Sequence, residues 1–384
     1  MKTIDLVYFN AGGGHRAAAL ALQEVIREQK RPWNVRLVNL VDVLDPNANF
    51  RKFTGMAPED LYNRRLASGW TLGLAQELKL LQSMIRLGHA SLLRALQLHW
   101  LTTEPDLVVS LVPNFNRALC ESVASTLPGV PFVTVLTDMA DHPPHFWIEP
   151  GQDQHLVCGT THAVAQARTA GYAPRQISLT SGMMLRPAFH KPMNIDRDAE
   201  RRALGLDPSL PTGIVMFGGQ GSAQMAGIAK SLRDVQLILM CGHNETLASK
   251  LRTMQTKLPH AVLGFTSDVG RYMQLADFFI GKPGPGCLSE AVQMGLPVIT
   301  VHNAWTMPQE RYNTRWVREQ GVGLVLPSMR AIRAGVAEMV LRLPEFRECV
   351  NRIDNRAVFE VPQILADLLQ ASATVLPTAQ RVAA

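Results

Sequence analysis

The first segment that could do chemistry is a run of glycines that ends in a histidine, directly after an apolar stretch over residues 4–9. Its residues are Asn10, Ala11, Gly12, Gly13, Gly14, His15 and Arg16. Glycines let the backbone approach a ligand, and free N–H groups at the start of a helix attract negative charge. The imidazole of His15 has an intrinsic pKa near neutrality, so it could act as a general base. The alternative is a histidine that only packs at the start of a helix over 17–29.

Two further glycine turns occur in the second half of the chain. The first comprises Phe217, Gly218, Gly219, Gln220, Gly221 and Ser222, and the second comprises Gly281, Lys282, Pro283, Gly284, Pro285, Gly286, Cys287 and Leu288. Each follows an apolar run and precedes a helical pattern, so its backbone N–H groups could hold a diphosphate. Glu290 lies one helical turn further on, where a carboxylate could bind the two hydroxyls of a ribose. Taken alone, the 217–222 turn could also be only a tight strand-to-helix connection.

The sequence lacks the motifs of several other kinds of binding site. The dinucleotide pattern Gly-x-Gly-x-x-Gly with its acidic partner and the phosphate loop Gly-Lys-Ser/Thr are both absent. Asp138, Asp141, His142 and His145 show no firm ligand spacing, so we expect no metal site. No Cys-x-x-Cys pair occurs, so neither a disulfide framework nor a zinc ribbon is indicated. The cysteines are Cys120, Cys158, Cys241, Cys287 and Cys349.

The elements that must position these turns alternate between short β-branched runs and longer helical stretches. The strands expected in the first half cover 4–9, 35–41, 107–112, 132–136 and 155–157; those in the second half cover 213–217, 237–241, 261–263, 277–280 and 297–301. This alternation is typical of parallel α/β units. Since each series has its own glycine-rich first turn, we predict an α/β fold made of two Rossmann-like domains.

A proline-flanked polar segment over 186–192 is a suitable linker, so we place the domain boundary near residue 190. The expected parts are an N-terminal domain over 1–190, a C-terminal domain over 191–360, and a helix and tail over 361–384 that could pack back on the N-terminal domain. Asp196 and Asp198 lie just past the linker and ahead of a helix. We interpret them as helix caps and not as a cation site.

Charge and hydropathy narrow the range of partners. The 384 residues carry 38 Lys and Arg against 32 Asp and Glu, a net charge of +6 that favours an anionic partner. The basic residues are dispersed and not interleaved with aromatic ones, so we expect no nucleic-acid binding. No apolar run approaches the length of a membrane span, and the N-terminus is typical of a strand and not of a secretory signal. Any membrane contact would therefore be peripheral.

Residues 72–101 form a helical pattern that places basic side chains among apolar ones. The apolar positions are Leu74, Leu78, Leu81, Ile85, Leu92 and Leu96, and the basic ones are Lys79, Arg86 and Arg94. One interpretation is a core helix with a solvated face. The other is an interfacial surface whose apolar side chains enter lipid while its cations meet anionic headgroups.

The order of the motifs resembles glycosyltransferase family 28, in particular its monogalactosyldiacylglycerol synthases and processive diacylglycerol glucosyltransferases. The matching segments are Gly12 to His15, Phe217 to Gly219, Cys241 to Asn244, Gly264 to Phe265, Gly284 to Gly286 with Glu290, and Gln309, Glu310 and Asn313. The resemblance covers nearly the whole chain and is strongest over 213–323. It implies a GT-B fold, with two Rossmann-like domains facing across a cleft, and an inverting reaction with a UDP-sugar donor.

The resemblance also implies roles for the donor-side residues. Phe265 is carried over to uracil recognition, Glu290 to the ribose, and Gln309 and Glu310 to sugar hydroxyls. The diphosphate would be held by Gly219, Gln220, Gly221 and Ser222 together with Gly284, Pro285, Gly286, Cys287 and Leu288. Gly218, His243 and Asn313 complete the expected donor site, and His243 stands where relatives often carry Arg.

The acceptor side is implied by a second loop. Thr137 and Asp138, followed by His142, His145 and Trp147, resemble the family's Thr-Asp-His-Trp loop, although the different spacing leaves open which histidine corresponds. Either His15 or Asp138 could deprotonate the acceptor hydroxyl, and we favour His15 as the base or as an acceptor-orienting group. The expected acceptor side consists of Gly12, Gly13, Gly14, His142, His145 and Trp147.

The resulting hypothesis is an inverting transferase that moves a hexose from UDP-galactose or UDP-glucose to diacylglycerol or a related lipid. It would need no cofactor besides the UDP-sugar donor substrate, and it would lie in the cytoplasm on the inner face of an anionic membrane. One alternative keeps the fold and uses a polyprenyl-linked or soluble acceptor. The other is a UDP-sugar epimerase, because that class also has paired Rossmann-like domains.

Overall fold

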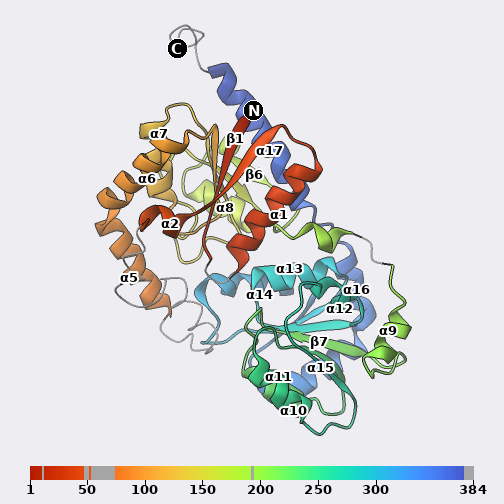
Figure 1. Ribbon diagram of the computed structural model, residues 1–384. Coiled ribbons are helices and arrows are strands. Elements are labelled where there is room, and N and C mark those ends of the chain that lie inside the picture. Colours follow the sequence, from red (N-terminus) through yellow and green to blue (C-terminus); the bar gives the residue numbers. More distant parts are fainter. Residues whose placement is uncertain (11–12, 47–51, 53–73, 192–193, 376–384) are drawn as a thin grey trace. The chain divides into compact units, whose positions relative to one another are not determined.

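The computed structural model describes residues 1–10, 13–46, 52, 74–191 and 194–375 (Figure 1). These residues form two compact units. Unit 1 contains the described residues up to Pro187 together with those from Arg356 onward, and unit 2 contains those from Ala188 to Asn355. The chain thus passes between units at 187/188 and 355/356, where the sequence suggested 190/191 and 360/361.

Unit 1 is built on a sheet of six parallel strands in the order β2-β1-β3-β4-β5-β6. The strands are β1 (Lys2–Tyr8), β2 (Trp33–Asn39), β3 (Leu107–Ser110), β4 (Phe132–Val135), β5 (His155–Cys158) and β6 (Ile177–Leu179). The central strands read as nearly continuous apolar runs because helices cover both of their faces. Such a sheet presents the carboxyl ends of its strands, and the loops that follow them, at one edge.

Helices cover both faces of the unit 1 sheet (Figure 1). They are α1 (Gly14–Glu28), α2 (Leu40–Leu44), α5 (Leu74–Leu87), α6 (His89–Thr103), α7 (Asn116–Thr126), α8 (Thr161–Thr169) and α17 (Ala357–Val375). On one face Ile4 and Leu6 of β1 pack with Leu22 of α1 and Leu365 of α17. On the other face Val7 of β1 packs with residues of α6 and α7. The C-terminal helix expected from residue 361 therefore begins at Ala357, and it lies against α1 through a cluster that includes Val25 and Val358.

The helix expected over 72–101 is instead two helices, which corrects the prediction; residues 72 and 73 lie outside the described residues. The helix α5 ends at Leu87 and α6 begins at His89. The residue between them, Gly88, has φ −83° and ψ 4°, a ψ far from that of a regular helix. Because glycine has a low helix propensity, interrupting the helix at Gly88 costs less free energy than at other residues.

Unit 2 repeats the architecture with six parallel strands in the order β12-β11-β10-β7-β8-β9. The strands are β7 (Thr212–Met216), β8 (Gln236–Met240), β9 (His260–Leu263), β10 (Phe278–Gly281), β11 (Val298–Val301) and β12 (Gly323–Leu326). The helices are α9 (Arg197–Ala203), α10 (Gln224–Ser231), α11 (Glu245–Arg252), α12 (Val269–Gln274), α13 (Pro285–Gln293), α14 (Arg311–Glu319), α15 (Ile332–Leu341) and α16 (Leu343–Asn351). The prediction of two parallel α/β units is confirmed, although β6 and β12 were missed.

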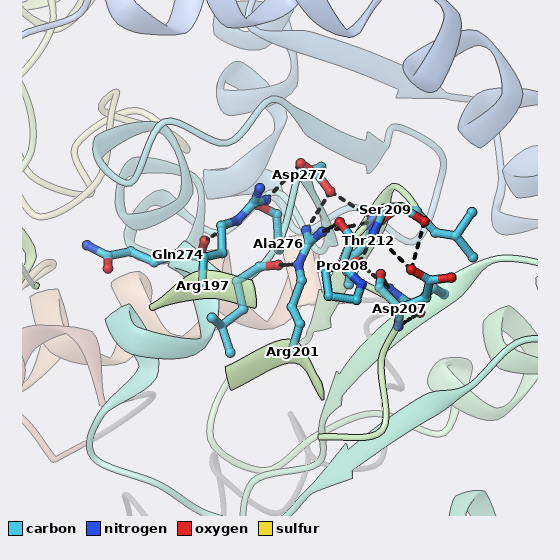
Figure 2. A network of polar contacts seen from close by, with 12 residues as sticks. Arg197, Arg201, Asp207, Pro208, Ser209, Thr212, Gln274, Ala276 and Asp277 are labelled. Atoms are coloured by element: carbon cyan, nitrogen blue, oxygen red, sulfur yellow. Dashed lines mark hydrogen bonds and ion pairs between the residues drawn. The ribbon is translucent and has the colours of Figure 1, made fainter. Parts of the chain in front are cut away.

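An ionic cluster fixes the first helix of unit 2 to the amino end of its sheet (Figure 2). The Asp277 carboxylate accepts hydrogen bonds from Arg197 at 2.8 Å, from Arg201 at 2.7 Å and from the backbone N–H of Thr212 at 2.8 Å. Burial alone would raise the pKa of Asp277, but these hydrogen bonds outweigh it and lower the pKa to about 2. Asp196 caps α9 by accepting from the N–H of Ala199 at 2.9 Å, which confirms its predicted capping role. Asp198 lies within the first turn of α9 and is not a cap, which corrects the prediction for that residue.

Candidate active site

The glycine run of unit 1 forms the turn between β1 and α1. Gly12 lies outside the described residues. Gly13 is the N-cap residue of α1 with φ +79°, a left-handed conformation that favours glycine, and it has no side chain to cap the helix. A Cβ on Gly13 or Gly14 would meet no described atom within 4 Å. The backbone at Gly13 and Gly14 therefore leaves space for a ligand among the described residues.

His15 lies in the first turn of α1 and contacts the loop that follows β4. Its Nδ1 lies 3.0 Å from Oγ1 of Thr137, and its ring centroid lies 5.8 Å from that of Trp147. Burial lowers the pKa of His15 to about 4, and a hydrogen bond with the backbone of Leu111 opposes that shift only partly. The imidazole is therefore neutral near pH 7 and can accept a proton.

Asp138 is held in place by the same loop. Its side chain is buried, and its Oδ2 accepts a hydrogen bond from Nε1 of Trp147 at 2.9 Å. Trp147 is fully buried and also contacts His15. The structure thus brings together the two residues that the sequence proposed as alternative bases.

Asp141 organises the rest of this loop, a role that the sequence did not reveal. Its carboxylate accepts hydrogen bonds from the backbone N–H groups of His145 at 3.1 Å, Trp147 at 2.6 Å and Ile148 at 3.3 Å. Burial raises the pKa of Asp141, and these hydrogen bonds oppose the rise. His142 precedes a cis peptide bond to Pro143, and both His142 and His145 are half-buried.

A small pocket of about 110 Å³ adjoins this loop in unit 1. It is lined by Gln82, Ile85, Arg86, His89, Asn114, Arg117, Ala118, His145 and Glu149. Nε2 of Gln82 donates to Oδ1 of Asn114 at 3.2 Å and lies 3.4 Å from the carbonyl oxygen of His145. Among the predicted acceptor-side residues only His145 lines the pocket, and α5 supplies a wall that the sequence motifs did not identify.

The helices α5 and α6 also expose large apolar side chains, which we call the α5–α6 apolar surface. Its members are Leu80, Leu81, Met84, Leu87, Leu98 and Leu101, with exposed fractions from 41% for Leu81 to 89% for Leu87. The spacing of 80, 84 and 87 places those side chains on one helical face. Leu78 and Leu96 are buried, whereas Lys79, Arg86 and Arg94 are exposed. One face of each helix therefore packs in the core while another presents apolar and basic side chains to solvent.

In unit 2, the 217–222 turn packs closely on the turn that follows β8. The N–H of His243 donates to the carbonyl of Gly219 at 2.9 Å. A Cβ on Gly242, which has φ +58°, would lie 2.1 Å from that same oxygen, and one on Gly221 would lie 2.7 Å from the carbonyl oxygen of Cys241. Only glycine fits at these two positions. Gly219 itself faces open space, and Gln220 beside it is exposed.

Two exposed aromatic rings form a stacked pair beside these turns. The rings of His243 and Phe265 have centroids 3.9 Å apart and an interplanar angle of 17°. Phe265 is 62% exposed although it is a large apolar side chain. A flat, exposed aromatic face at the carboxyl ends of parallel strands is suited to a planar ring.

The 281–288 turn leads into α13, whose N-terminus is open to a ligand. Gly284 is the N-cap residue and Pro285 follows it, and no side chain caps the helix. A Cβ on Gly286 would meet no described atom within 4 Å. Leu288 is buried in the core, so it can contribute only its backbone. Burial raises the pKa of the Cys287 thiol to about 12, so that thiol stays protonated near neutrality.

Three buried polar side chains lie next to this turn, two just before α14 and one in its first turn. They are Gln309, Glu310 and Asn313. Asn313 Nδ2 donates to the carbonyl of Pro283 at 2.7 Å, which ties α14 to the turn. Oε1 of Gln309 and Oδ1 of Asn313 are buried without a hydrogen-bond partner among the described residues. Buried acceptors of this kind are uncommon unless a ligand or water satisfies them.

Two further residues predicted for the donor site lie in α13 and in the 217–222 turn. Glu290 is half-buried one turn into α13, and Ser222 is half-buried at the end of the 217–222 turn. Lys282, to which the motifs assigned no role, forms an ion pair with Glu310, with Nζ 3.3 Å from Oε1. A lysine that lies between Gly281 and Gly284, in a turn predicted to hold a diphosphate, is the signal that could have identified it.

Metal-ligand clusters and membrane-spanning helices are both absent from the described residues. In the described part of the chain, no group of three or more His, Cys, Asp or Glu side chains is arranged to hold a metal ion. Among the same residues, no helix has both the length and the apolar character needed to cross a membrane.

Solved structures that share the two-unit architecture define the class of protein. MurG from Acinetobacter baumannii matches with a TM-score of 0.60 and 12% identity over 97% of this chain and 100% of that chain. The glycosyltransferase SnogD from Streptomyces nogalater matches with a TM-score of 0.53 and 15% identity over 96% of this chain and 100% of that chain. The chain therefore has the GT-B fold, as the sequence predicted.

Sequence comparison finds one matching family model and several relatives. Residues 214–365 match the model of the glycosyltransferase family 28 C-terminal domain. Monogalactosyldiacylglycerol synthase 1, chloroplastic, from Arabidopsis thaliana is 28% identical over 373 residues, which cover 88% of this chain and 64% of that protein. Probable monogalactosyldiacylglycerol synthase 2, chloroplastic, from Oryza sativa subsp. japonica is 27% identical, with coverages of 97% and 82%. Residues 214–365 thus resemble the C-terminal domain of glycosyltransferase family 28, and most of the chain is similar to monogalactosyldiacylglycerol synthases, although it spans less than two thirds of the length of the Arabidopsis relative.

Proposed function

We propose that this glycosyltransferase moves a hexose from UDP-galactose or UDP-glucose to the hydroxyl of diacylglycerol or a related lipid, with inversion at the anomeric carbon. The observation that carries the proposal is the convergence at α13. An uncapped helix N-terminus lies next to Gln309 and Asn313, whose buried oxygens have no partner among the described residues. N–H groups suit a diphosphate, and amide and carboxylate oxygens suit the hydroxyls of a hexose.

The donor would be bound entirely by unit 2. We assign the uracil to the stacked His243 and Phe265, the ribose to Glu290, and the hexose to the three polar residues at the start of α14. The diphosphate would meet the open backbone of the 217–222 and 284–288 turns. Support comes from the stacking distance of 3.9 Å and from the exposure of the Gly219 and Gly286 backbone.

Unit 1 would supply the base. His15 would accept the proton of the acceptor hydroxyl, and its ring is unprotonated near pH 7 because burial lowers its pKa to about 4. Asp138 remains the alternative base, and its hydrogen bond to the Trp147 indole orients its carboxylate. A direct displacement needs only one of the two, because no covalent intermediate forms. We propose no metal or other cofactor, since N–H dipoles and a cation can stabilise the leaving diphosphate.

The lipid acceptor would be reached at a membrane surface. The α5–α6 apolar surface exposes side chains that would be more stable in lipid than in water, and Lys79, Arg86 and Arg94 could meet anionic headgroups. We therefore propose peripheral binding to the inner, anionic face of the cytoplasmic membrane.

The experiment that tests the function combines the purified protein with UDP-galactose or UDP-glucose and vesicles of diacylglycerol in anionic phospholipid, in buffer containing EDTA. We expect release of UDP and formation of hexosyl-diacylglycerol, detected by mass spectrometry. The absence of both products with either donor would contradict the proposal.

Companion reactions distinguish the two alternatives. Transfer to a polyprenyl-linked or soluble acceptor, in the absence of transfer to diacylglycerol, would replace the lipid assignment while keeping the enzyme class. Conversion of the UDP-sugar to its epimer without any acceptor would identify an epimerase instead. Neighbours of the second class include a UDP-GlcNAc 2-epimerase from Neisseria meningitidis, with a TM-score of 0.57 and 11% identity, so the fold alone does not separate them.

A further inference from the structure

One cation of unit 2 lies in the proposed diphosphate site without a role assigned by any motif. Lys282 follows β10, two residues before the N-cap residue of α13. Its Nζ lies 3.3 Å from Oε1 of Glu310. The Glu310 side chain is 6% exposed and that of Lys282 is 35% exposed. The carboxylate is therefore enclosed, whereas its partner cation can reach a ligand in solution.

The ion pair lies against the N-cap residue of α13. A Cβ on Gly284 would be 3.2 Å from Cε of Lys282 and 3.3 Å from Oε1 of Glu310. Asn313 holds the same turn through its hydrogen bond to the Pro283 carbonyl. The ammonium group, the carboxylate and the N-terminus of α13 thus converge on one small volume.

The electrostatics of this volume favour an exchange in which Lys282 leaves Glu310 for the diphosphate and Glu310 then accepts from the hexose. A buried carboxylate is costly without a compensating charge, so Glu310 needs Lys282 as long as no ligand is bound. A diphosphate that reaches the N-terminus of α13 carries more negative charge than Glu310 and is attracted by the helix dipole as well. Hexose hydroxyls can then donate to Glu310 in place of the ammonium group. Gln309 and Asn313, whose buried oxygens accept no hydrogen bond from the described residues, lie in the same region, where hexose hydroxyls could donate to them.

We propose that Lys282 is a catalytic residue that binds the donor diphosphate and neutralises the departing UDP, with Glu310 as its counterion while the donor is absent. This inference rests on the proposed function. It predicts that the diphosphate and the hexose bind cooperatively, because the diphosphate takes the cation and the hexose takes the carboxylate.

Lys282 should affect kcat because the chemical step changes the charge of the phosphate beside it. The acceptor oxygen forms a bond to the anomeric carbon while the bond from that carbon to the β-phosphate oxygen breaks. Both electrons of the broken bond remain on UDP, and the acceptor proton passes to the base in unit 1. Negative charge therefore grows on the β-phosphate, so its attraction to Nζ is stronger in the transition state than in the bound substrate.

The first experiment compares Lys282→Met and Lys282→Arg with Lys250→Met, a control at an exposed lysine of α11 in the same unit. Calorimetry measures the Kd of UDP and of uridine, and the vesicle assay measures kcat. We expect Lys282→Met to weaken UDP binding by at least about tenfold, to leave uridine binding unchanged, and to lower kcat by about a hundredfold. Lys282→Arg should retain most of the UDP affinity, and the control should match the wild type. Unchanged uridine binding shows that Lys282→Met is folded.

A second variant tests this exchange by whether UDP affinity rises or falls. Glu310→Gln removes the negative charge that competes for Lys282. UDP alone should therefore bind several-fold more tightly to this variant than to the wild type. The contribution of the hexose to affinity, measured as the ratio of the Kd of UDP to the Kd of UDP-hexose, should fall, because the hexose hydroxyls lose the carboxylate of Glu310. Equal weakening of both ligands would overturn the counterion role of Glu310.

The outcomes separate this inference from the proposed function. A wild type that binds neither UDP nor UDP-hexose contradicts the function itself. A wild type that binds and transfers, together with a Lys282→Met variant whose UDP affinity and kcat are unchanged, overturns only the role of Lys282.

Discussion

At the residue scale, the base proposed for unit 1 depends on the protonation state of the His15 imidazole. Burial lowers the pKa of His15 to about 4, so the ring loses its proton well below neutrality. As the pH falls, His15 becomes protonated only near that value and stops acting as a base there. We therefore predict no inflection near pH 6.5 from His15 in a profile of kcat/KM between pH 5 and 8. An inflection near 6.5 that His15→Gln abolishes would contradict this assignment.

Substitution of the two candidate bases should identify the one that acts. His15→Gln and Asp138→Asn are each compared with the wild type for UDP affinity and for kcat. Loss of the base should lower kcat by about 10²- to 10⁴-fold with UDP affinity unchanged, since the proposed UDP site lies in unit 2. We expect that result for His15→Gln. If both variants keep full turnover, neither residue is the base.

Gly242 is the residue of the donor site with the least tolerance for a side chain. Its Cβ would lie 2.1 Å from the carbonyl oxygen of Gly219, which is backbone and cannot turn away. We predict that Gly242→Ala separates the two turns and weakens UDP binding by at least about tenfold, measured by calorimetry.

The matched control is Gly227→Ala in α10, where a Cβ would meet no described atom within 4 Å. It should raise the free energy of unfolding by about 0.5–1 kcal/mol and leave UDP binding unchanged, because alanine is the better helix former. A Gly242→Ala variant with wild-type UDP affinity would show that the contact between the turns does not shape the site.

At the scale of elements, α9 is anchored to the unit 2 sheet through Asp277 (Figure 2). Asp277→Asn would leave the buried Arg201 facing a neutral amide, so unfolding of unit 2 by denaturant should become easier by about 3–5 kcal/mol at pH 7. The pKa of Asp277 is lowered to about 2 in the fold from an ordinary value of 3.8. A depressed pKa stabilises the fold above the unfolded-state value, and this contribution is lost as the pH falls from about 4 toward 2. A difference between the variant and the wild type that stays constant down to pH 2 would contradict this assignment.

The α5–α6 apolar surface should determine membrane binding. We predict that replacing Leu80, Met84 and Leu87 with Gln weakens binding to anionic vesicles by at least about tenfold, because each apolar side chain that leaves water stabilises the bound state. Vesicle sedimentation measures the binding. Leu341→Gln is the matched control, since Leu341 is 81% exposed in unit 2. Equal loss in the control, or no loss in the triple variant, would place the contact elsewhere.

The sequence predicted elements well where periodicity and glycine turns agree. The turns at 217–222 and 281–288 lie at the ends of β7 and β10, because an apolar run followed by glycines leaves little alternative. The strand β6 was missed because it has only three residues, and its polar Ser178 gives no alternation to detect. The break at Gly88 was missed because the apolar spacing continues through it.

The candidate site could be predicted only where a motif names its residues. His15, Asp138, Glu290 and Gln309 belong to recognisable segments. In contrast, the support that Asp141 gives its loop arises from three backbone hydrogen bonds that no residue spacing reveals. The pairing of Lys282 with Glu310 joins residues 28 positions apart in sequence, on different elements, so only the fold brings them together.

At the scale of the whole molecule, the two units divide the proposed reaction. Each has its own sheet and core, so the donor site can form in unit 2 while the base and the apolar surface belong to unit 1. The net charge of +6 favours both an anionic nucleotide and an anionic bilayer. This division predicts that changes to the α5–α6 apolar surface leave UDP affinity unaltered and that changes to Lys282 leave vesicle binding unaltered.

Hexose transfer to a lipid with inversion makes a definite prediction for the anomeric configuration and the yield of the product. Wild-type protein, diacylglycerol vesicles and a UDP-hexose with an α-linked sugar are followed by NMR together with UDP release. We predict one molecule of β-hexosyl-diacylglycerol for each UDP released, and no UDP release above hydrolysis when diacylglycerol is omitted. An α-linked product would contradict inversion, and UDP release without any glycolipid would contradict lipid transfer itself.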